Sequence, residues 1–291
     1  MQLTAYIEGI GLLGPGLTDW PTSRPILCAQ QVYQPSRTVL PSPAWLPAAE
    51  RRRSGAIVKL TLATGLEAIA AAGLNPAELP SVFSSSGGDG DNCHAICEML
   101  ASDDRQISPT RFHSSVHNTA AGYWSIATGA MTTASVLCAY DASFGAGLLE
   151  ALAQVAADDT RTVLLACDTA YPQPLFSTRP IPDAFGMALV LAPRGSERSL
   201  AQITVDLTHA SADRLDDPAL ESLRTAIPAA RGLPMLRSIA LVQDDQLAPL
   251  CINPEVAHQR LRIRECPQRI ELRIEERVIR VGRLPAVVER R

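Results

Sequence analysis

Residues 133–166 read TASVLCAYDASFGAGLLEALAQVAADDTRTVLLA, and this stretch decides the fold class. Residues 133–140 carry no charge, and Asp141 is the first charged residue after them. This uncharged run predicts a buried strand. Residues 143–157 predict a helix with Gly and Ala gathered on one side, which lets it approach a neighbour closely. Residues 163–166 are wholly apolar, and residues 162–166 predict a second buried strand. The order strand, helix, strand is typical of an α/β domain.

The same alternation continues on both sides of this stretch. Further strands are predicted at residues 3–11, 81–85 and 188–191, and helices at 48–73, 92–101 and 118–128. Residues 20–47 are rich in Pro, Ser and Arg and predict a long surface excursion. We therefore expect residues 1–195 to form an α/β domain whose mixed sheet is covered by helices on both faces.

Beyond Arg194 the pattern weakens. Strands are predicted at 202–207 and 238–242, a helix at 218–226, and an exposed strand or hairpin within 268–281. We expect residues 196–291 to be a reduced C-terminal extension.

Composition excludes several classes of protein. The 291 residues are 46% hydrophobic, with a formal net charge of −4, which favours a packed globular protein and gives no general reason to expect nucleic-acid binding. No run of about 18 apolar residues predicts a membrane span, and we expect no signal peptide. Seven cysteines without regular spacing suggest reduced thiols and a cytoplasmic location. Two local basic features, residues 51–53 and 260–291, are either solvated surface or a docking site for an acidic partner such as an acyl carrier protein.

Residue chemistry alone indicates neither a metal nor a cofactor. The motif Cys93-His94-x-x-Cys97-Glu98 lacks a second ligand pair for structural zinc, so we expect buried thiols on an amphipathic helix. The Gly-rich residues 86–90 lack the dinucleotide-binding spacing, and Lys59, the only lysine, cannot serve a P-loop. No serine stands in a GxSxG elbow. Four histidines could act as bases, but no motif places any of them beside a nucleophile: His113, His117, His209 and His258.

Four segments in order resemble the N-terminal half of β-ketoacyl-acyl-carrier-protein synthases. They are YIEGIGLLG at 6–14, LATGLEAIAAAGL at 62–74, VFSSSG at 82–87, and ISP at 107–109 followed by NTAAG at 118–122 and SI at 125–126. The resemblance covers about residues 3–192. It implies a thiolase-like fold with a largely complete N-terminal half and a truncated second half.

The chain departs from this family where the nucleophile belongs. The family carries a Cys at an elbow after a strand, whereas ungapped counting places Asp141 there and one insertion places Ala142, with Ser143 next. Cys138 stands three or four positions early. A thiolate is needed because it exchanges thioesters at nearly equal energy, which neither a carboxylate nor alanine can do. The family's two catalytic histidines and lysine also have no counterpart after residue 195, so we expect no catalytic residue in this chain.

The resemblance therefore implies a partner subunit. The chain is similar to chain-length factors, most of all to the short type that accompanies ketosynthases of aryl-polyene clusters. This resemblance implies a heterodimer with a full-length ketosynthase and transient contact with acyl carrier protein. By the same resemblance, interface or tunnel positions are expected at Phe112, Val116, Asn118, Tyr123, Trp124, Val136 and Cys138. The aromatic members could equally be ordinary core. Two alternatives stay open: an independent synthase or acyltransferase using Cys138 or Ser143, and a carrier-protein-binding module.

Overall fold

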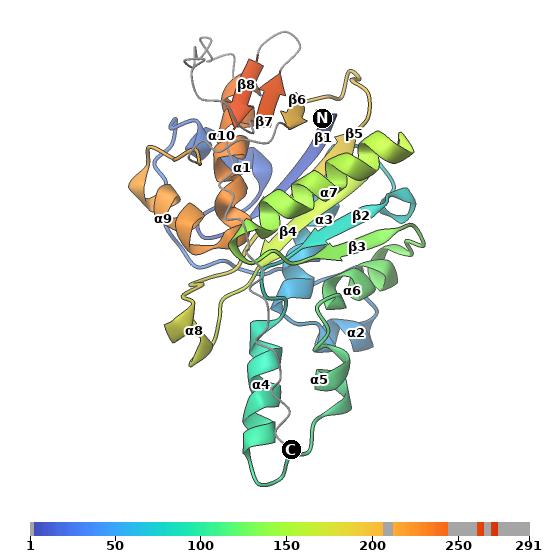
Figure 1. The fold of residues 1–291 in the computed structure, drawn as a ribbon, viewed down its shortest axis with the longest axis vertical. Coiled ribbons are helices and arrows are strands. Elements are labelled where there is room, and N and C mark those ends of the chain that lie inside the picture. The colour runs from blue at the N-terminus through green and yellow to red at the C-terminus, as the bar shows by residue number, and fades with distance from the viewer. Residues whose placement is uncertain (1–2, 206–211, 244–260, 265–268, 273–291) are drawn as a thin grey trace, which may run out of the picture.

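The computed structural model describes residues 3–205, 212–243, 261–264 and 269–272. Its strands join in one mixed sheet in the order β3-β2-β4-β5-β1-β6-β7-β8 (Figure 1). The strands are β1 (Leu3–Leu13), β2 (Ser81–Ser84), β3 (Ala134–Leu137), β4 (Thr162–Asp168), β5 (Phe185–Ala192), β6 (Ala201–Val205), β7 (Leu261–Arg264) and β8 (Arg269–Leu272). Strands β3, β2 and β4 run parallel, and β5, β1, β6, β7 and β8 follow in antiparallel pairs.

Helices cover both faces of this sheet. They are α1 (Trp20–Leu27), α2 (Ala48–Arg53), α3 (Ala56–Ala71), α4 (Gly90–Ala101), α5 (Pro109–His113), α6 (Thr119–Thr128), α7 (Ser143–Asp158), α8 (Leu175–Thr178), α9 (Pro218–Ala226) and α10 (Leu233–Gln243). Short 3-10 turns are η1 (Pro76–Glu78), η2 (Tyr140–Ala142) and η3 (Pro228–Gly232). No helix among the described residues is long and apolar enough to cross a membrane.

Strand β4 shows why two layers of helices are needed. All its residues are buried, and successive side chains alternate between two hydrophobic clusters. Leu164 belongs to the cluster that α7 and α10 complete, whereas Leu165 belongs to the one that α3 and α6 complete. On β1, Gly9 and Gly11 let α3 lie directly on the sheet, because a Cβ at either position would collide with a backbone carbonyl of α3. The predicted α/β fold, with its mixed sheet layered between helices, is confirmed.

Three expectations about local structure are wrong. Residues 48–73 form two helices, because Gly55 adopts an extended backbone beside the Asp89 carboxylate. Residues 20–47 are not wholly a surface excursion: they begin with α1, which Asp19 caps and which buries Trp20 and Leu27. Residues 238–242 belong to α10 rather than to a strand, since Leu236, Ile239 and Ala240 follow helical spacing and face the core. A short apolar run cannot be told from a buried helix by periodicity alone.

The predicted helix at 218–226 is confirmed as α9. Strand β6 extends the sheet at the free side of β1, and α9 and α10 pack in the same cluster as α7; the boundary expected at residue 195 stays a prediction. A strand or hairpin was expected at 268–281. Residues 269–272 form β8, which pairs with β7, and residues 273–281 lie outside the described residues. His209, His258 and most of the basic segment 260–291 also lie outside them.

Candidate functional site

The candidate site lies where three parallel strands end together. Strands β3, β2 and β4 bring their carboxyl ends to one edge of the sheet. The elbow between β3 and α7, the loop of residues 85–88 after β2, and Asp168 at the end of β4 therefore meet there. In open α/β sheets this is the edge at which ligands and reactive groups gather.

The side chain of Ser143 holds the elbow together. Strand β3 ends at Leu137, three residues earlier than expected, and η2 turns the chain into α7. The Ser143 hydroxyl donates to the Tyr140 carbonyl at 2.7 Å and accepts from the Ala139 N–H at 3.0 Å. The residue is 1% exposed. Both hydrogen-bonding roles of the hydroxyl are thus used by the backbone of the turn.

Asp141 is held by two arginines from separate parts of the chain. Its Oδ1 accepts from Arg179 Nη2 at 2.8 Å and its Oδ2 from Arg231 Nη2 at 3.2 Å. Arg179 follows α8, and Arg231 lies in η3. The guanidinium of Arg179 also stacks on the ring of Tyr140, 3.8 Å from its centre. The carboxylate at the elbow is therefore ion-paired on both oxygens, and the adjacent Ala142 offers no reactive group.

Cys138 is the first residue after β3 and is exposed. Its thiol donates to the carbonyl of Ser86 at 3.3 Å, while Nε2 of His117 lies 3.2 Å from the carbonyl of Ser85. Within the described part of the chain, the thiol and the imidazole thus bond to different carbonyl groups rather than to each other. The pairing of a nucleophile with a general base that acyl transfer requires is not formed between these two residues.

Asp168 was missed by the sequence interpretation and connects the site to the core. It is 2% exposed and accepts from the N–H and the hydroxyl of Ser86, both at 2.7 Å, and from the N–H of Ala229 at 2.8 Å. Burial raises the pKa of Asp168, and these hydrogen bonds oppose the rise. One carboxyl group thus fixes β4, the loop after β2, and η3, which carries Arg231. The available signal was an acidic residue two positions after the apolar run at 163–166.

The structure separates the predicted interface residues into two groups. Phe112 and Val116 are 67% and 54% exposed, and Asn118 is exposed at the start of α6. Tyr123 and Trp124 are buried. Trp124 packs edge-on against Phe83 with ring centres 6.2 Å apart. Val136 is half-buried on the edge strand, two residues before Cys138. The roles of these residues at an interface or tunnel stay proposals.

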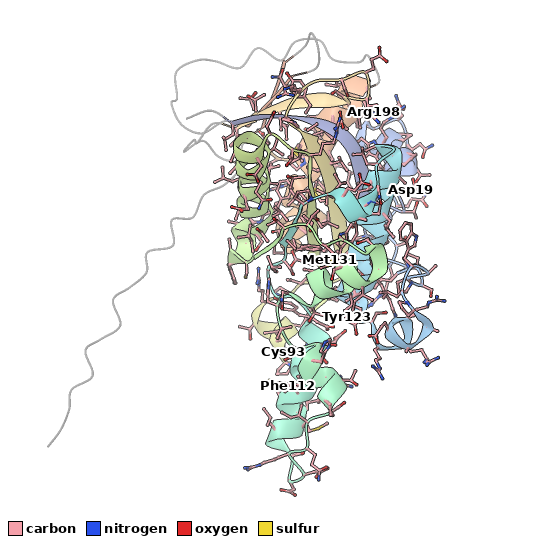
Figure 2. The ribbon with its side chains drawn as sticks, turned by 90° about the vertical axis from the view of Figure 1, so that its right-hand side faces the viewer. Asp19, Cys93, Phe112, Tyr123, Met131 and Arg198 are labelled. Carbon is pink, nitrogen blue, oxygen red and sulfur yellow. The ribbon has the colours of Figure 1, made fainter. Side chains whose placement is uncertain are left out.

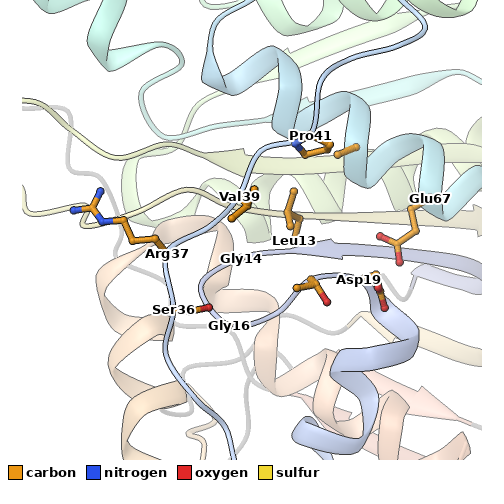
Figure 3. A pocket seen from close by; sticks show the side chains of 11 residues that line it. Leu13, Gly14, Gly16, Asp19, Ser36, Arg37, Val39, Pro41 and Glu67 are labelled. Atoms are coloured by element: carbon orange, nitrogen blue, oxygen red, sulfur yellow. The ribbon is translucent and has the colours of Figure 1, made fainter.

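A separate pocket of about 450 Å³ lies beside the turn that follows β1 (Figure 3). It is bordered by that turn, residues 36–41 and α3. Glu67 lies at its wall and accepts from the N–H of Leu12 at 2.9 Å and of Trp20 at 2.6 Å. Burial, with Asp19 adding to it, raises the pKa of Glu67 to about 7. Among the described residues no three His, Cys, Asp or Glu side chains are grouped to hold a metal ion.

Solved structures share this fold. A chain of the complex of the ketosynthase ApeO with its chain length factor ApeC from Xenorhabdus doucetiae is 20% identical, with a TM-score of 0.63 over 89% of this chain and 98% of that chain. A chain of AntDE:AntF, a type II acyl-carrier protein in complex with its ketosynthase, is 10% identical, with a TM-score of 0.64 over 84% and 94%. The ishigamide ketosynthase/chain length factor is 16% identical, with a TM-score of 0.57 over 84% and 81%.

No curated protein matches the sequence significantly. The family "Beta-ketoacyl synthase, N-terminal domain" matches residues 27–238, which include the elbow, the loop after β2 and Asp168. Together with the shared fold, this match shows that the chain belongs to the β-ketoacyl synthase N-terminal domain family.

Proposed function

We propose that this chain is a non-catalytic, chain-length-factor-like subunit that pairs with an active β-ketoacyl synthase. The observation that carries the proposal is the elbow. Asp141 is ion-paired to two arginines, Ala142 has no reactive group, and the hydroxyl of Ser143 is buried and fully hydrogen-bonded. A member of this family without an elbow nucleophile cannot form the acyl thioester, so a role beside a complete synthase follows. The neighbouring folds include complexes of ketosynthases with chain length factors.

The edge of the sheet supports pairing with another subunit. Among the described strands, β3 bonds to β2 on one side only, and residues 133–139 contain neither charge nor proline. An apolar open edge invites pairing or aggregation, so soluble proteins cover it. Ile126 and Met131, which precede the strand, are 49% and 95% exposed. We expect a partner to bury roughly 2,000 Å² or more here, as obligate interfaces do.

Helix α2 supports transient contact with an acidic carrier protein. Arg51, Arg52 and Arg53 are all exposed. Arg51 is fixed by the carbonyls of Ala44 and Leu46, and Arg53 lies 3.6 Å from Glu50. Arg52 makes no such contact with the described residues, so its charge can serve a partner. The proposed setting is the cytoplasm, with acyl thioesters of the fatty-acid, polyketide or aryl-polyene type as the partner's substrates.

Two experiments test this function. Co-expression with a complete ketosynthase from the same gene neighbourhood should give a heterodimer on size-exclusion chromatography, and only the complex should condense acyl with malonyl thioesters. Incubation of the isolated chain with an acyl thioester should leave Cys138 unmodified by mass spectrometry. Stoichiometric acylation of Cys138, lost in Cys138→Ser, would instead establish the independent acyltransferase.

A further inference from the structure

The α4–α5 arm, defined as residues 89–117, projects from the body of the molecule (Figure 1). Its helix α4 is capped by Asp89, whose side chain accepts from the N–H of Asn92 at 3.0 Å. Cys93 and Cys97 lie one turn apart on this helix, and both are exposed. Figure 2 shows Cys93 on the arm. The expectation of buried thiols is therefore wrong, and the helix presents a pair of accessible sulfur atoms.

The two cysteines stand four residues apart on α4, so their side chains lie on one face of the helix. Burial, with the neighbouring Cys97 adding to it, raises the pKa of the Cys93 thiol. Residues four apart on a helix have Cβ atoms about 5–6 Å apart, whereas a disulfide needs about 3.5–4.5 Å. Direct oxidation would thus require α4 to unwind. A metal ion between the sulfur atoms adds two metal–sulfur bonds of about 2.3 Å each, so it can span the pair with the helix intact.

The surroundings select the kind of ion. Thiolates favour Cu(I), Zn(II) and iron–sulfur clusters. Structural zinc takes four protein ligands and iron–sulfur clusters usually take four cysteines, but the described part of the chain supplies no third ligand at this place. His94, one residue along, is turned to Glu98, with Nε2 3.2 Å from Oε1. Cu(I) is satisfied by two thiolates.

We propose that Cys93 and Cys97 form a two-coordinate binding site for Cu(I) on the exposed face of α4. Binding breaks two S–H bonds and forms two Cu–S bonds, and both protons leave to solvent. The copper enters and stays as Cu(I), so no electron is transferred. The site uses neither the elbow nor the edge strand, and it stands independently of the proposed pairing with a ketosynthase.

Competition with bicinchoninate tests the site. The reduced full-length chain is titrated anaerobically into the Cu(I)–bicinchoninate complex, and the loss of its colour measures copper transfer. Wild type should withdraw one equivalent of copper more than Cys93→Ser or Cys97→Ser. Its apparent affinity for copper at this site should be at least about 100-fold higher than that of either variant, since loss of even an outer-shell group lowers metal affinity by about 10–100-fold. Cys138→Ser removes an exposed thiol that contacts the Ser86 carbonyl, and it should behave as wild type.

The other cysteines are common to wild type and both α4 variants, so their contribution cancels in the comparison. Far-UV circular dichroism should be unchanged on copper loading, because the ion spans an intact helix. Equal copper uptake by wild type, Cys93→Ser and Cys97→Ser would overturn the proposal, as would loss of helical signal when copper binds. A failed heterodimer assay would leave this result untouched.

Discussion

Replacement of Glu67 by Gln should change how the stability of the fold depends on pH. In the folded chain the carboxyl group lies at the pocket wall between α3, β1 and α1, and its two oxygens accept the N–H groups of Leu12 and Trp20. Its pKa is raised from 4.5 to about 7, chiefly by burial. The folded state therefore keeps this proton over a pH range in which the unfolded chain has already lost it.

The sign and size follow from linkage. For an acid with a raised pKa, the stabilisation is fully present below pH 4.5 and is lost as the pH rises through about 7. A rise of this size corresponds to roughly 3 kcal/mol at most. Solvent reaches the group from the pocket and lowers that figure. The glutamine of the variant would not titrate, and its amide would leave one backbone N–H without an acceptor, at a cost of about 1–3 kcal/mol.

Urea unfolding of wild type and Glu67→Gln between pH 5 and pH 8 measures the difference. Wild type should lose up to about 3 kcal/mol relative to the variant across this range, while other groups affect both proteins equally. The matched control is Glu78→Gln, which changes an exposed carboxylate on η1 and should run parallel to wild type. If the free energies of unfolding of wild type and Glu67→Gln differ by the same amount at every pH, the reasoning is refuted.

Three further changes probe the edge strand and the core. Val136→Asp places a charge in the half-buried edge strand and should abolish the heterodimer on size-exclusion chromatography; a soluble variant that still pairs contradicts the interface. Trp124→Ala should lower the free energy of unfolding by about 3–5 kcal/mol in urea, and a smaller loss with altered product length would assign it to the tunnel instead. Asp168→Asn leaves the Ala229 N–H facing an amide nitrogen, and a chemical-denaturation loss of about 1–3 kcal/mol is expected; an unchanged midpoint would show that η3 does not depend on this clamp.

Local patterns predicted the elements that are buried on both faces. Strand β4 and helix α7 lie within one or two residues of their predicted bounds, because a strand packed on both sides needs an unbroken apolar run and α7 needs one apolar stripe. Residues 238–242 satisfied a strand pattern as well as a helix pattern, and only packing of α10 against the core decides between them. Tertiary contact overrode the local preference there.

The partners of the elbow could not be predicted in this way. Asp141 is separated by 38 positions from Arg179 and by 90 from Arg231. No periodicity relates residues at such distances, because only the topology of the sheet brings α8 and η3 to the carboxyl end of β3. The turn itself could be predicted from the sequence, because the uncharged strand, Asp141 and the Gly- and Ala-rich helix follow one another directly along the chain.

The ion pairs at the elbow also have a consequence for the edge strand. Strand β3 has four residues and, of the strands that the structure describes, hydrogen-bonds to β2 alone, so its own ladder holds it weakly. Its carboxyl end continues into η2, which Ser143 closes and which Arg179 and Arg231 tie to the body through Asp141. A catalytic elbow must leave its nucleophile free, whereas this one uses the side chains of Asp141 and Ser143 to fix the turn. We infer that Asp141 and Ser143 hold the edge strand in the geometry that the proposed partner subunit would need.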